Sequence, residues 1–392
     1  MSAMPRIDAR PSGTASKGSL RVALVAPNVV RRDGQGRVMV ELCQALVARG
    51  HQVTVLAHRC DDDVAAEVDF RAVRRAPGPQ IVDDLYLLAA TSRALRRIDH
   101  DVAMVMGPCG LGPGPCVYNA QFSHHGWRAS WAHGRPPLPR RIHVRFLEWL
   151  TRRVVRRCTH VIASTPRVAA DVTVGTATPA SVVPDGVDVA EFPLVSDARR
   201  SEARLALGLD ADERVVAFLG DYHTPRKGLD PLLRAIAEGP GDERLVVASR
   251  GDDGALERRA ADLGVTAQVM VAGFAPPDTV IAAADVVAVP SLYEPFSLVA
   301  FEAAASGVPL VLSRRAGAAE LLAGCAHEVD DPSDPSQLRA ALDGVWADPA
   351  AAHDLTLRAR RVAETMVWPD LMAQAVDVLE SVAVAGRAVR RA

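Results

Sequence analysis

The stretch Ser291-Leu-Tyr-Glu-Pro-Phe-Ser-Leu-Val-Ala-Phe-Glu-Ala-Ala-Ala-Ser-Gly307 decides how this chain of 392 residues is interpreted. It follows an apolar run, residues 285–290, which predicts a buried strand. Residues 297–306 predict a helix, because a glycine and a proline follow them directly and end it. Glu294 is therefore expected on a strand-to-helix loop, and Glu302 about one turn into the helix.

A helix N-terminus lies between these two glutamates. Its first backbone N–H groups have no intrahelical partner and the macrodipole is positive there, so this end favours an anion. The donor-binding residues predicted at this turn are Phe296, Ser297, Leu298 and Val299. Amides suited to a diphosphate, flanked by two carboxylates that can bind sugar and ribose hydroxyls, predict a site for a nucleotide sugar.

The segment resembles the E-x7-E signature of retaining glycosyltransferases with the GT-B fold, in the large family called family 4 or glycosyl transferases group 1. Three further segments resemble that family in the expected order, and the resemblance spans roughly residue 20 to the C-terminus. They are Arg21-Val-Ala-Leu-Val-Ala-Pro27 with Gly34-Gln-Gly36 (first strand and glycine loop), Val182-Val-Pro-Asp-Gly-Val-Asp-Val-Ala-Glu-Phe192 (interdomain signature) and Phe218-Leu-Gly-Asp-Tyr-His-Thr-Pro-Arg-Lys-Gly228 (diphosphate loop).

Length and composition fit a globular protein of two domains. A chain of 392 residues is longer than a domain with one ordinary hydrophobic core. Its composition, 49% hydrophobic and 23% charged residues, is usual for a globular protein. The net charge of −2 gives no argument for a nucleic-acid partner. Six scattered cysteines, with no Cys-x-x-Cys pair, argue against zinc and favour a reduced, cytoplasmic setting. Basic residues are almost all arginine, which suggests a high-GC bacterium; the lysines are Lys17 and Lys227.

Strand and helix patterns alternate through both halves of the chain. Continuous apolar strands between helices predict an α/β fold with parallel sheets covered on both faces, and ligand at the strands' C-terminal ends. Together with the resemblance, this predicts two Rossmann-like domains facing a central cleft. The expected order is a disordered tail (1–19), an acceptor domain (20–190), a nucleotide-sugar donor domain (191–366) and a helix that crosses back (367–392).

The loop from residue 220 to residue 228 is the predicted site for the leaving diphosphate. Negative charge grows on that group in the transition state, so fixed cations aimed at it are the natural catalyst. Lys227 and Arg226 are the candidates, against the alternative that Lys227 is an ordinary surface lysine. Asp221 stands where the family has an arginine. It could point away, pair with Arg226, or meet an amino or hydroxyl group of an unusual donor.

Two glycines and one serine complete the donor-binding prediction. Gly34 and Gly36 open a helix after the first strand and would allow close backbone approach, although Met39 at the third position excludes a dinucleotide fingerprint. Ser297 stands where the family usually has glycine. A serine can cap the helix, but its side chain narrows the approach of a phosphate.

A histidine pair follows the strand predicted at residues 116–120. In the family a histidine in this region reaches the donor sugar, so His124 or His125 is a candidate catalytic residue beside Glu294, and spacing does not choose between them. Trp127 and Trp131 could stack on an acceptor or simply pack.

The arginine-rich segment of residues 139–158, from Pro139 to Cys158, supports two interpretations. It could be a basic amphipathic helix that lies on an anionic membrane, at the inner membrane face. The favoured interpretation is an ordinary helix with its apolar stripe on the sheet and its arginines in water.

The resemblance implies a retaining, metal-independent transferase of the hexosyltransferase type. The donor would be UDP- or GDP-linked, with no other cofactor, and the acceptor a hydroxyl of a small molecule, lipid or glycan. No metal ligands are expected, since Lys227 and the helix amides can carry the charge. A nucleotide-sugar epimerase of the same fold and a non-catalytic GT-B binding subunit, suggested by Asp221 and Ser297, are the alternatives.

Overall fold

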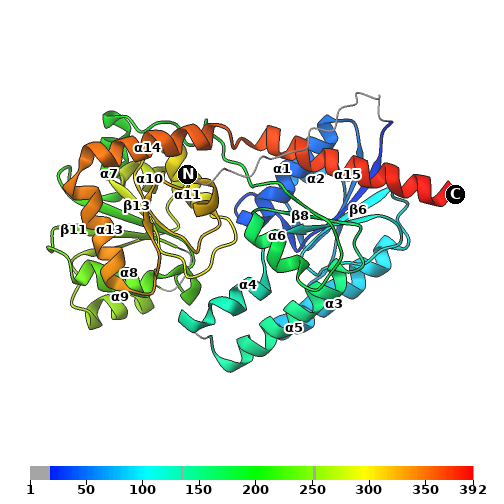
Figure 1. The fold of residues 1–392 in the computed structure, drawn as a ribbon, viewed down its shortest axis with the longest axis horizontal. Coiled ribbons are helices and arrows are strands. Elements are labelled where there is room, and N and C mark those ends of the chain that lie inside the picture. The colour runs from blue at the N-terminus through cyan, green and yellow to red at the C-terminus, as the bar shows by residue number, and fades with distance from the viewer. Residues whose placement is uncertain (1–17, 134–135, 250–252, 392) are drawn as a thin grey trace.

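The computed structural model describes residues 18–133, 136–249 and 253–391, so most of the tail predicted at residues 1–19 lies outside it. Within the described ranges the chain forms two parallel sheets, each flanked by helices on both faces, and the two layered units lie side by side (Figure 1). The expected α/β architecture with parallel sheets in two domains is confirmed. The boundaries proposed at residues 190 and 366 stay predictions.

A seven-stranded sheet organises the N-terminal half, with strand order β5-β3-β1-β6-β7-β8-β9. Its central strands β6 and β7 are buried at every position, which is why β6 is wholly apolar and β7 is apolar except for Asn119. The strands are β1 (Arg21–Val25), β3 (Gln52–Ala57), β5 (Asp69–Ala72), β6 (Val102–Met106), β7 (Cys116–Ala120), β8 (His160–Ala163) and β9 (Ala180–Val182), with a separate pair β2 (Asn28–Val29) and β4 (Arg59–Cys60). The helices are α1 (Gly34–Ala48), α2 (Asp62–Glu67), α3 (Gln80–Leu95), α4 (His124–Ala129), η1 (Ser130–His133), α5 (Leu138–Val155) and α6 (Pro166–Thr173).

A six-stranded sheet organises the C-terminal half, with strand order β12-β11-β10-β13-β14-β15. The chain leaves β10 toward β11 and later returns to the other side of β10 as β13, so the crevice between these two strand ends is the expected ligand position. The strands are β10 (Arg214–Leu219), β11 (Glu243–Ala248), β12 (Val269–Gly273), β13 (Val286–Val289), β14 (Leu310–Ser313) and β15 (His327–Val329). The helices are α7 (Asp197–Leu207), η2 (Pro225–Lys227), α8 (Leu229–Ala237), α9 (Asp253–Asp262), α10 (Pro277–Ala283), α11 (Leu298–Ser306), α12 (Ala318–Leu321), α13 (Pro335–Ala347) and α14 (Pro349–Glu364).

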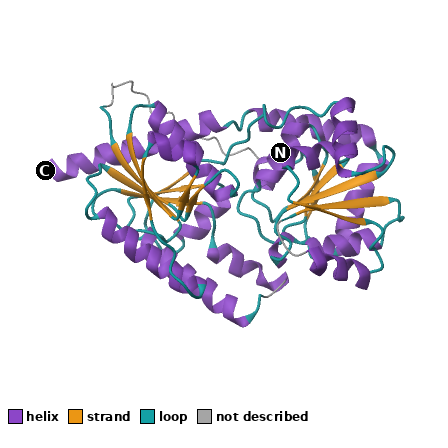
Figure 2. Cartoon of the chain, turned by 180° about the vertical axis from the view of Figure 1, so that it is seen from behind, coloured by secondary structure: helices purple, strands orange, loops and turns teal. Residues whose placement is uncertain are grey.

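The last helix, α15 (Trp368–Arg391), starts at the junction of the two halves and runs along the N-terminal half (Figures 1 and 2). Ion pairs fasten it there: Arg49 to Asp377 at 2.6 Å, and Arg387 to Asp101 at 3.0 Å. None of the helices in the described ranges is both long enough and apolar enough to cross a membrane.

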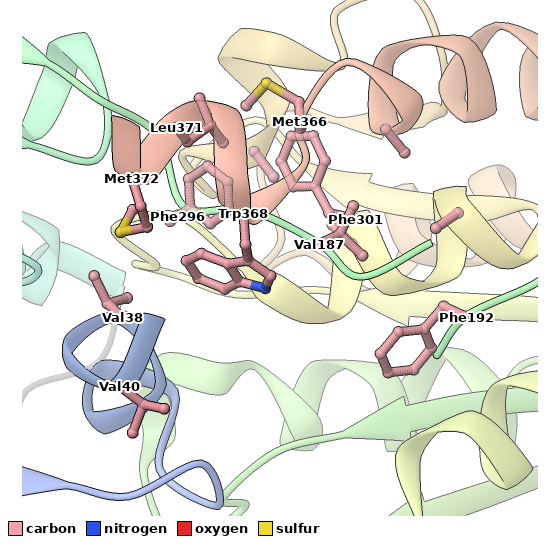
Figure 3. Close-up of a cluster of buried hydrophobic side chains, with 14 of the residues drawn as sticks. Val38, Val40, Val187, Phe192, Phe296, Phe301, Met366, Trp368, Leu371 and Met372 are labelled. Carbon is pink, nitrogen blue, oxygen red and sulfur yellow. The ribbon is translucent and has the colours of Figure 1, made fainter. Parts of the chain in front are cut away.

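A buried apolar cluster fills the junction between the halves (Figure 3). Trp368 is 4% exposed and packs so closely on Gly186 that a Cβ there would lie 2.7 Å from the indole. The backbone joins at the same place, because Val187 N–H donates to the Met366 carbonyl at 2.7 Å. One apolar core therefore connects α1, the interdomain linker, α11 and α15.

Truncation of the junction tryptophan should destabilise the protein strongly. Trp368→Ala removes a buried indole and leaves a cavity, so we expect the unfolding free energy to fall by about 3–5 kcal/mol. The matched control is Trp149→Ala, since Trp149 is 51% exposed and its loss should change stability by about 0.5 kcal/mol or less. Urea denaturation followed by circular dichroism measures both, and equal effects would contradict the assigned role of the junction.

Candidate functional site

Glu294 lies between two cations in the crevice between β10 and β13. Its Oε2 is 2.6 Å from Lys227 Nζ and 2.7 Å from Arg226 Nη1, and Arg226 also donates to the Tyr293 carbonyl at 3.2 Å. Burial alone would raise the pKa of Glu294, but the charges and hydrogen bonds of Lys227 and Arg226 outweigh it and lower that pKa to about 2. Glu294 is therefore ionised at neutral pH.

Two glycines allow the loops of this crevice to touch. Gly228 has φ +76°, and a Cβ there would lie 1.9 Å from the Pro290 carbonyl oxygen, so no other residue fits without a backbone shift. A Cβ at Gly317 would lie equally close to the Pro295 carbonyl, and the Gly317 N–H donates to the Glu294 carbonyl at 2.8 Å. The loop that carries Glu294 is thus held from two sides.

Ser297 begins α11 in a strained conformation. Its φ of +100° is the one positive φ of a non-glycine residue among those that the structure describes, which explains why glycine suits this position. Its Oγ accepts from the Ala300 N–H at 3.4 Å, so the predicted helix cap is confirmed. Strained backbone of this kind costs about 1–3 kcal/mol and is concentrated at functional sites.

The two glycines predicted near the donor have different surroundings. Gly34 faces α11, because a Cβ there would lie 3.5 Å from Leu298 Cδ1. Gly36, in the first turn of α1, instead packs on the preceding loop, where a Cβ would lie 2.6 Å from the Val30 carbonyl oxygen. The helix that these glycines were expected to open begins at Gly34.

Glu302 is partly buried at the junction, one turn into α11. Burial raises its pKa to about 7, Glu191 adds to the shift, and Arg37 opposes it. It lines a recess with Arg37 and Trp368. Arg37, which sequence reasoning missed, lies 2.8 Å from Glu191 Oε2 and over the Trp368 ring at 5.8 Å. Its position directly after the glycine loop was the available signal.

The structure distinguishes the two histidines. His125 Nδ1 lies 2.9 Å from Glu148 Oε1, and Arg128 and Arg152 bind the same carboxylate. His124 Nδ1 is buried and has no hydrogen-bond partner within the described part of the chain. Burial lowers the pKa of His124 to about 4, so its imidazole is neutral at pH 7.

An aromatic contact across the two halves, which sequence reasoning also missed, connects His124 to the crevice. The centroid of the Phe122 ring lies 5.1 Å from that of the His124 ring and 5.5 Å from that of the Tyr293 ring. The Arg226 guanidinium carbon lies 5.7 Å from the Phe122 centroid. The Ser123 N–H donates to the Tyr293 hydroxyl at 3.2 Å. The adjacency of Tyr293 to Glu294 was the available signal.

The tryptophans after the histidine pair pack together. Trp127 and Trp131 are each 7% exposed, lie edge to face at 6.3 Å and belong to the same cluster as Tyr293. Of the two interpretations offered for them, the structure supports packing.

Asp221 binds its own turn. Its carboxylate accepts from the His223 N–H at 3.0 Å and from the Thr224 hydroxyl at 2.8 Å, a common use of aspartate in turns. The alternative that Asp221 pairs with Arg226 is wrong, because Arg226 binds Glu294. Among the described residues, no group of three or more His, Cys, Asp or Glu side chains is arranged to hold a metal ion.

Two Rossmann-like sheets, with a pair of cations at one switch point, fit the architecture of GT-B glycosyltransferases. The sequence model "Glycosyl transferases group 1" matches residues 213–348, and "Glycosyltransferase Family 4" matches residues 32–191. The chain belongs to this family: it is a family 4-type GT-B glycosyltransferase by sequence and fold.

Known proteins agree with this assignment. The chain is 38% identical over 210 residues to a D-inositol 3-phosphate glycosyltransferase of Mycolicibacterium vanbaalenii. The aligned region covers 48% of this chain and 44% of that protein. It is 32% identical over 209 residues to an uncharacterized glycosyltransferase of Methanocaldococcus jannaschii, covering 50% and 53%. The chain thus spans about half the length of the curated relatives it matches.

Solved structures share the fold. Sucrose-phosphate synthase from Thermosynechococcus elongatus has a TM-score of 0.75 at 21% identity, covering 93% of this chain and all of that one. HepE from Anabaena, crystallised with UDP and glucose, has a TM-score of 0.71 at 18% identity, covering 92% and 100%.

The raised pKa of Glu302 predicts a pH dependence of stability. Between its ordinary value of 4.5 and about 7, the folded protein retains a proton that the unfolded chain loses, so this residue's contribution falls as pH rises through that window. Glu302→Gln cannot titrate and should shrink the loss of unfolding free energy between pH 5 and pH 8. Urea titrations at both values measure it, and an unchanged loss in the variant would refute the assignment.

Proposed function

We propose that the protein is a retaining glycosyltransferase of the hexosyltransferase type, which moves a sugar from a UDP- or GDP-linked donor to an acceptor hydroxyl without a metal ion or other cofactor. The observation that carries this proposal is the group of Glu294, Lys227 and Arg226 beside the N-terminus of α11.

The charge balance of this group suits a diphosphate. Two cations face one carboxylate, so the site keeps a net positive charge. The α11 N-terminus adds the macrodipole and its first amides. Because Ser297 already caps Ala300, the amides that precede Ala300 are the ones left for an anion. A leaving diphosphate gains charge in the transition state, so these groups bind it most strongly there.

Glu294 then binds a sugar hydroxyl while Lys227 and Arg226 turn toward phosphate oxygens. His124 is the proposed catalytic histidine because its Nδ1 is unpartnered within the described residues. We assign to His125 the positioning of α4 against α5 through Glu148. No side chain in this group is placed as a general base, and the leaving phosphate takes the acceptor proton in the proposed same-face reaction.

Similar proteins support the donor class. HepE, of the same fold, was solved with UDP and with UDP-glucose. The acceptor hydroxyl belongs to a small molecule, lipid or glycan, and peripheral membrane contact through residues 139–158 is part of the proposal. Both residues that suggested a non-catalytic subunit, Asp221 and Ser297, have local structural roles as turn and helix cap.

Nucleotide binding should depend on Lys227. A charge-assisted hydrogen bond contributes about 1.5–3 kcal/mol, so Lys227→Ala should weaken the binding of UDP or GDP about 10- to 100-fold. Isothermal titration calorimetry with both nucleotides measures this and identifies the base. The matched control is Arg358→Ala, which removes a surface cation paired with Asp354 and should bind as the unaltered protein does. No binding of either nucleotide by that protein would overturn the proposed donor.

Turnover should depend on the Glu294 carboxylate. Glu294→Gln keeps the shape but removes the charge, and we expect transfer of sugar to fall at least ~100-fold, the loss typical of a group that stabilises a transition state. Proton NMR of the product should show the anomeric configuration of the donor, as a retaining reaction requires. Addition of EDTA should leave the transfer rate unchanged, as a reaction without a metal ion requires.

Two outcomes would contradict this function. Conversion of donor without an acceptor would identify an epimerase. Undiminished turnover by folded Glu294→Gln would show that Glu294 is not catalytic.

A further inference from the structure

Helix α5 has apolar side chains on two faces. The inner ones, Val144, Leu150, Val154 and Val155, are buried. The outer ones, Leu138, Ile142 and Trp149, are 62%, 59% and 51% exposed. With Arg145 between them they follow a spacing of three and four residues, which makes one stripe along the helix. The favoured interpretation, an apolar stripe on the sheet, explains the inner face but leaves the outer one unexplained.

The outer face is cationic. Arg153 lies over the Trp149 ring at 4.6 Å, so an aromatic side chain and a cation share this surface. The one acidic residue within the helix, Glu148, is buried and bound by Arg128 and Arg152. The exposed arginines of the helix and the turn after it are Arg140, Arg145, Arg153, Arg156 and Arg157. Arg140 lies over the Trp127 ring and Arg156 donates to the Gly175 carbonyl, so Arg145, Arg153 and Arg157 carry the charge argument.

Helix α3 extends this surface. Asp84 Oδ2 lies 2.7 Å from His143 Nε2, which holds α3 beside α5, and both helices lie along one edge of the N-terminal half (Figure 1). The acids of α3 also face partners, since Asp83 accepts from the Ala76 N–H at 2.8 Å. We call the exposed apolar side chains of the two helices the α3–α5 face; they are Val82, Leu85, Tyr86, Leu138, Ile142 and Trp149.

This concentration is unusual for the molecule. Among the residues that the structure describes, thirteen large hydrophobic side chains are exposed, and six of them form the α3–α5 face. The others are on separate elements, as single surface residues normally are. Exposed apolar side chains gathered in this way are typical of a surface that binds another protein or a membrane.

We propose that the α3–α5 face docks on an anionic lipid bilayer. Large aliphatic and aromatic side chains enter the boundary between headgroups and acyl chains, and basic residues beside them attract anionic headgroups. The exposed arginines, with every acid of α3 and α5 turned to a partner, give the charge complementarity that selects an anionic lipid surface over a neutral one.

The geometry relates this surface to the crevice. Helix α5 holds α4 through Glu148 and His125, and α4 carries His124 toward Phe122 and the crevice. The docked face therefore lies on the side of the N-terminal half that presents α4, so the bilayer would lie next to the histidine side of the site. The inference rests on the peripheral membrane contact of the proposed function, which it deepens by naming the surface and the lipid charge, and it does not depend on the donor.

Vesicle co-sedimentation of the whole protein tests the proposal. We expect binding to vesicles of phosphatidylcholine with phosphatidylglycerol, little binding to phosphatidylcholine alone, and release by high salt. The double variants Ile142→Ser with Trp149→Ser, and Arg145→Glu with Arg153→Glu, should each lower binding at least about tenfold. They change exposed side chains, so circular dichroism and nucleotide binding should stay as in the unaltered protein.

The matched control is Leu205→Ser, which removes an apolar side chain that is 82% exposed on α7 and should leave vesicle binding unchanged. Three outcomes overturn the proposal: no binding to anionic vesicles, equal binding to neutral ones, or binding that neither double variant weakens. If the protein bound no anionic vesicles but bound an acidic protein through the same arginines, the face would be assigned to a protein partner. Nucleotide binding in every case reports separately on the donor site.

Discussion

A single carboxylate between two cations holds the candidate site together. Glu294 is partly enclosed, yet it is ionised because Lys227 and Arg226 contact it at 2.6 and 2.7 Å. A buried charge without such partners would cost several kcal/mol. The contact also fixes the backbone around it, since Arg226 accepts the Leu292 N–H through its carbonyl at 2.7 Å. Two loops that are 68 residues apart in sequence thereby become one surface.

The same constraint reaches the other half of the molecule. Arg226 lies against Phe122, and Tyr293 accepts from Ser123, so the loop that carries Glu294 contacts the turn that carries His124. Farther along α11, Glu302 lines a recess with Trp368, the first residue of α15. The C-terminal half therefore meets the N-terminal half through the aromatic contact of Phe122 with Tyr293 and again at the apolar junction.

Much of this architecture could be predicted from the sequence, because buried parallel strands leave continuous apolar runs such as residues 286–289. The loop position of Glu294 and the cap formed by Ser297 followed from local spacing and side-chain chemistry. The contacts between Phe122 and Tyr293, and between Arg226 and Glu294, could not be predicted, since they join distant segments that only the folded chain brings together. His124 and His125 have the same local context, and only Glu148, on another helix, distinguishes them. The outer stripe of α5 was visible at helical spacing but could not be separated from core packing without exposure.

The pairing of Glu294 with both cations also bears on how a reaction cycle ends. The carboxylate holds the same two side chains that the proposed diphosphate would need. Under the proposed function, nucleotide binding would be an exchange of one anion for another, and its net free energy would be smaller than the bare attraction suggests. A product nucleotide would compete with the Glu294 carboxylate for these two cations. With the proposed donor, such a site would limit inhibition by its own product, because Glu294 would regain Lys227 and Arg226 as the diphosphate departs.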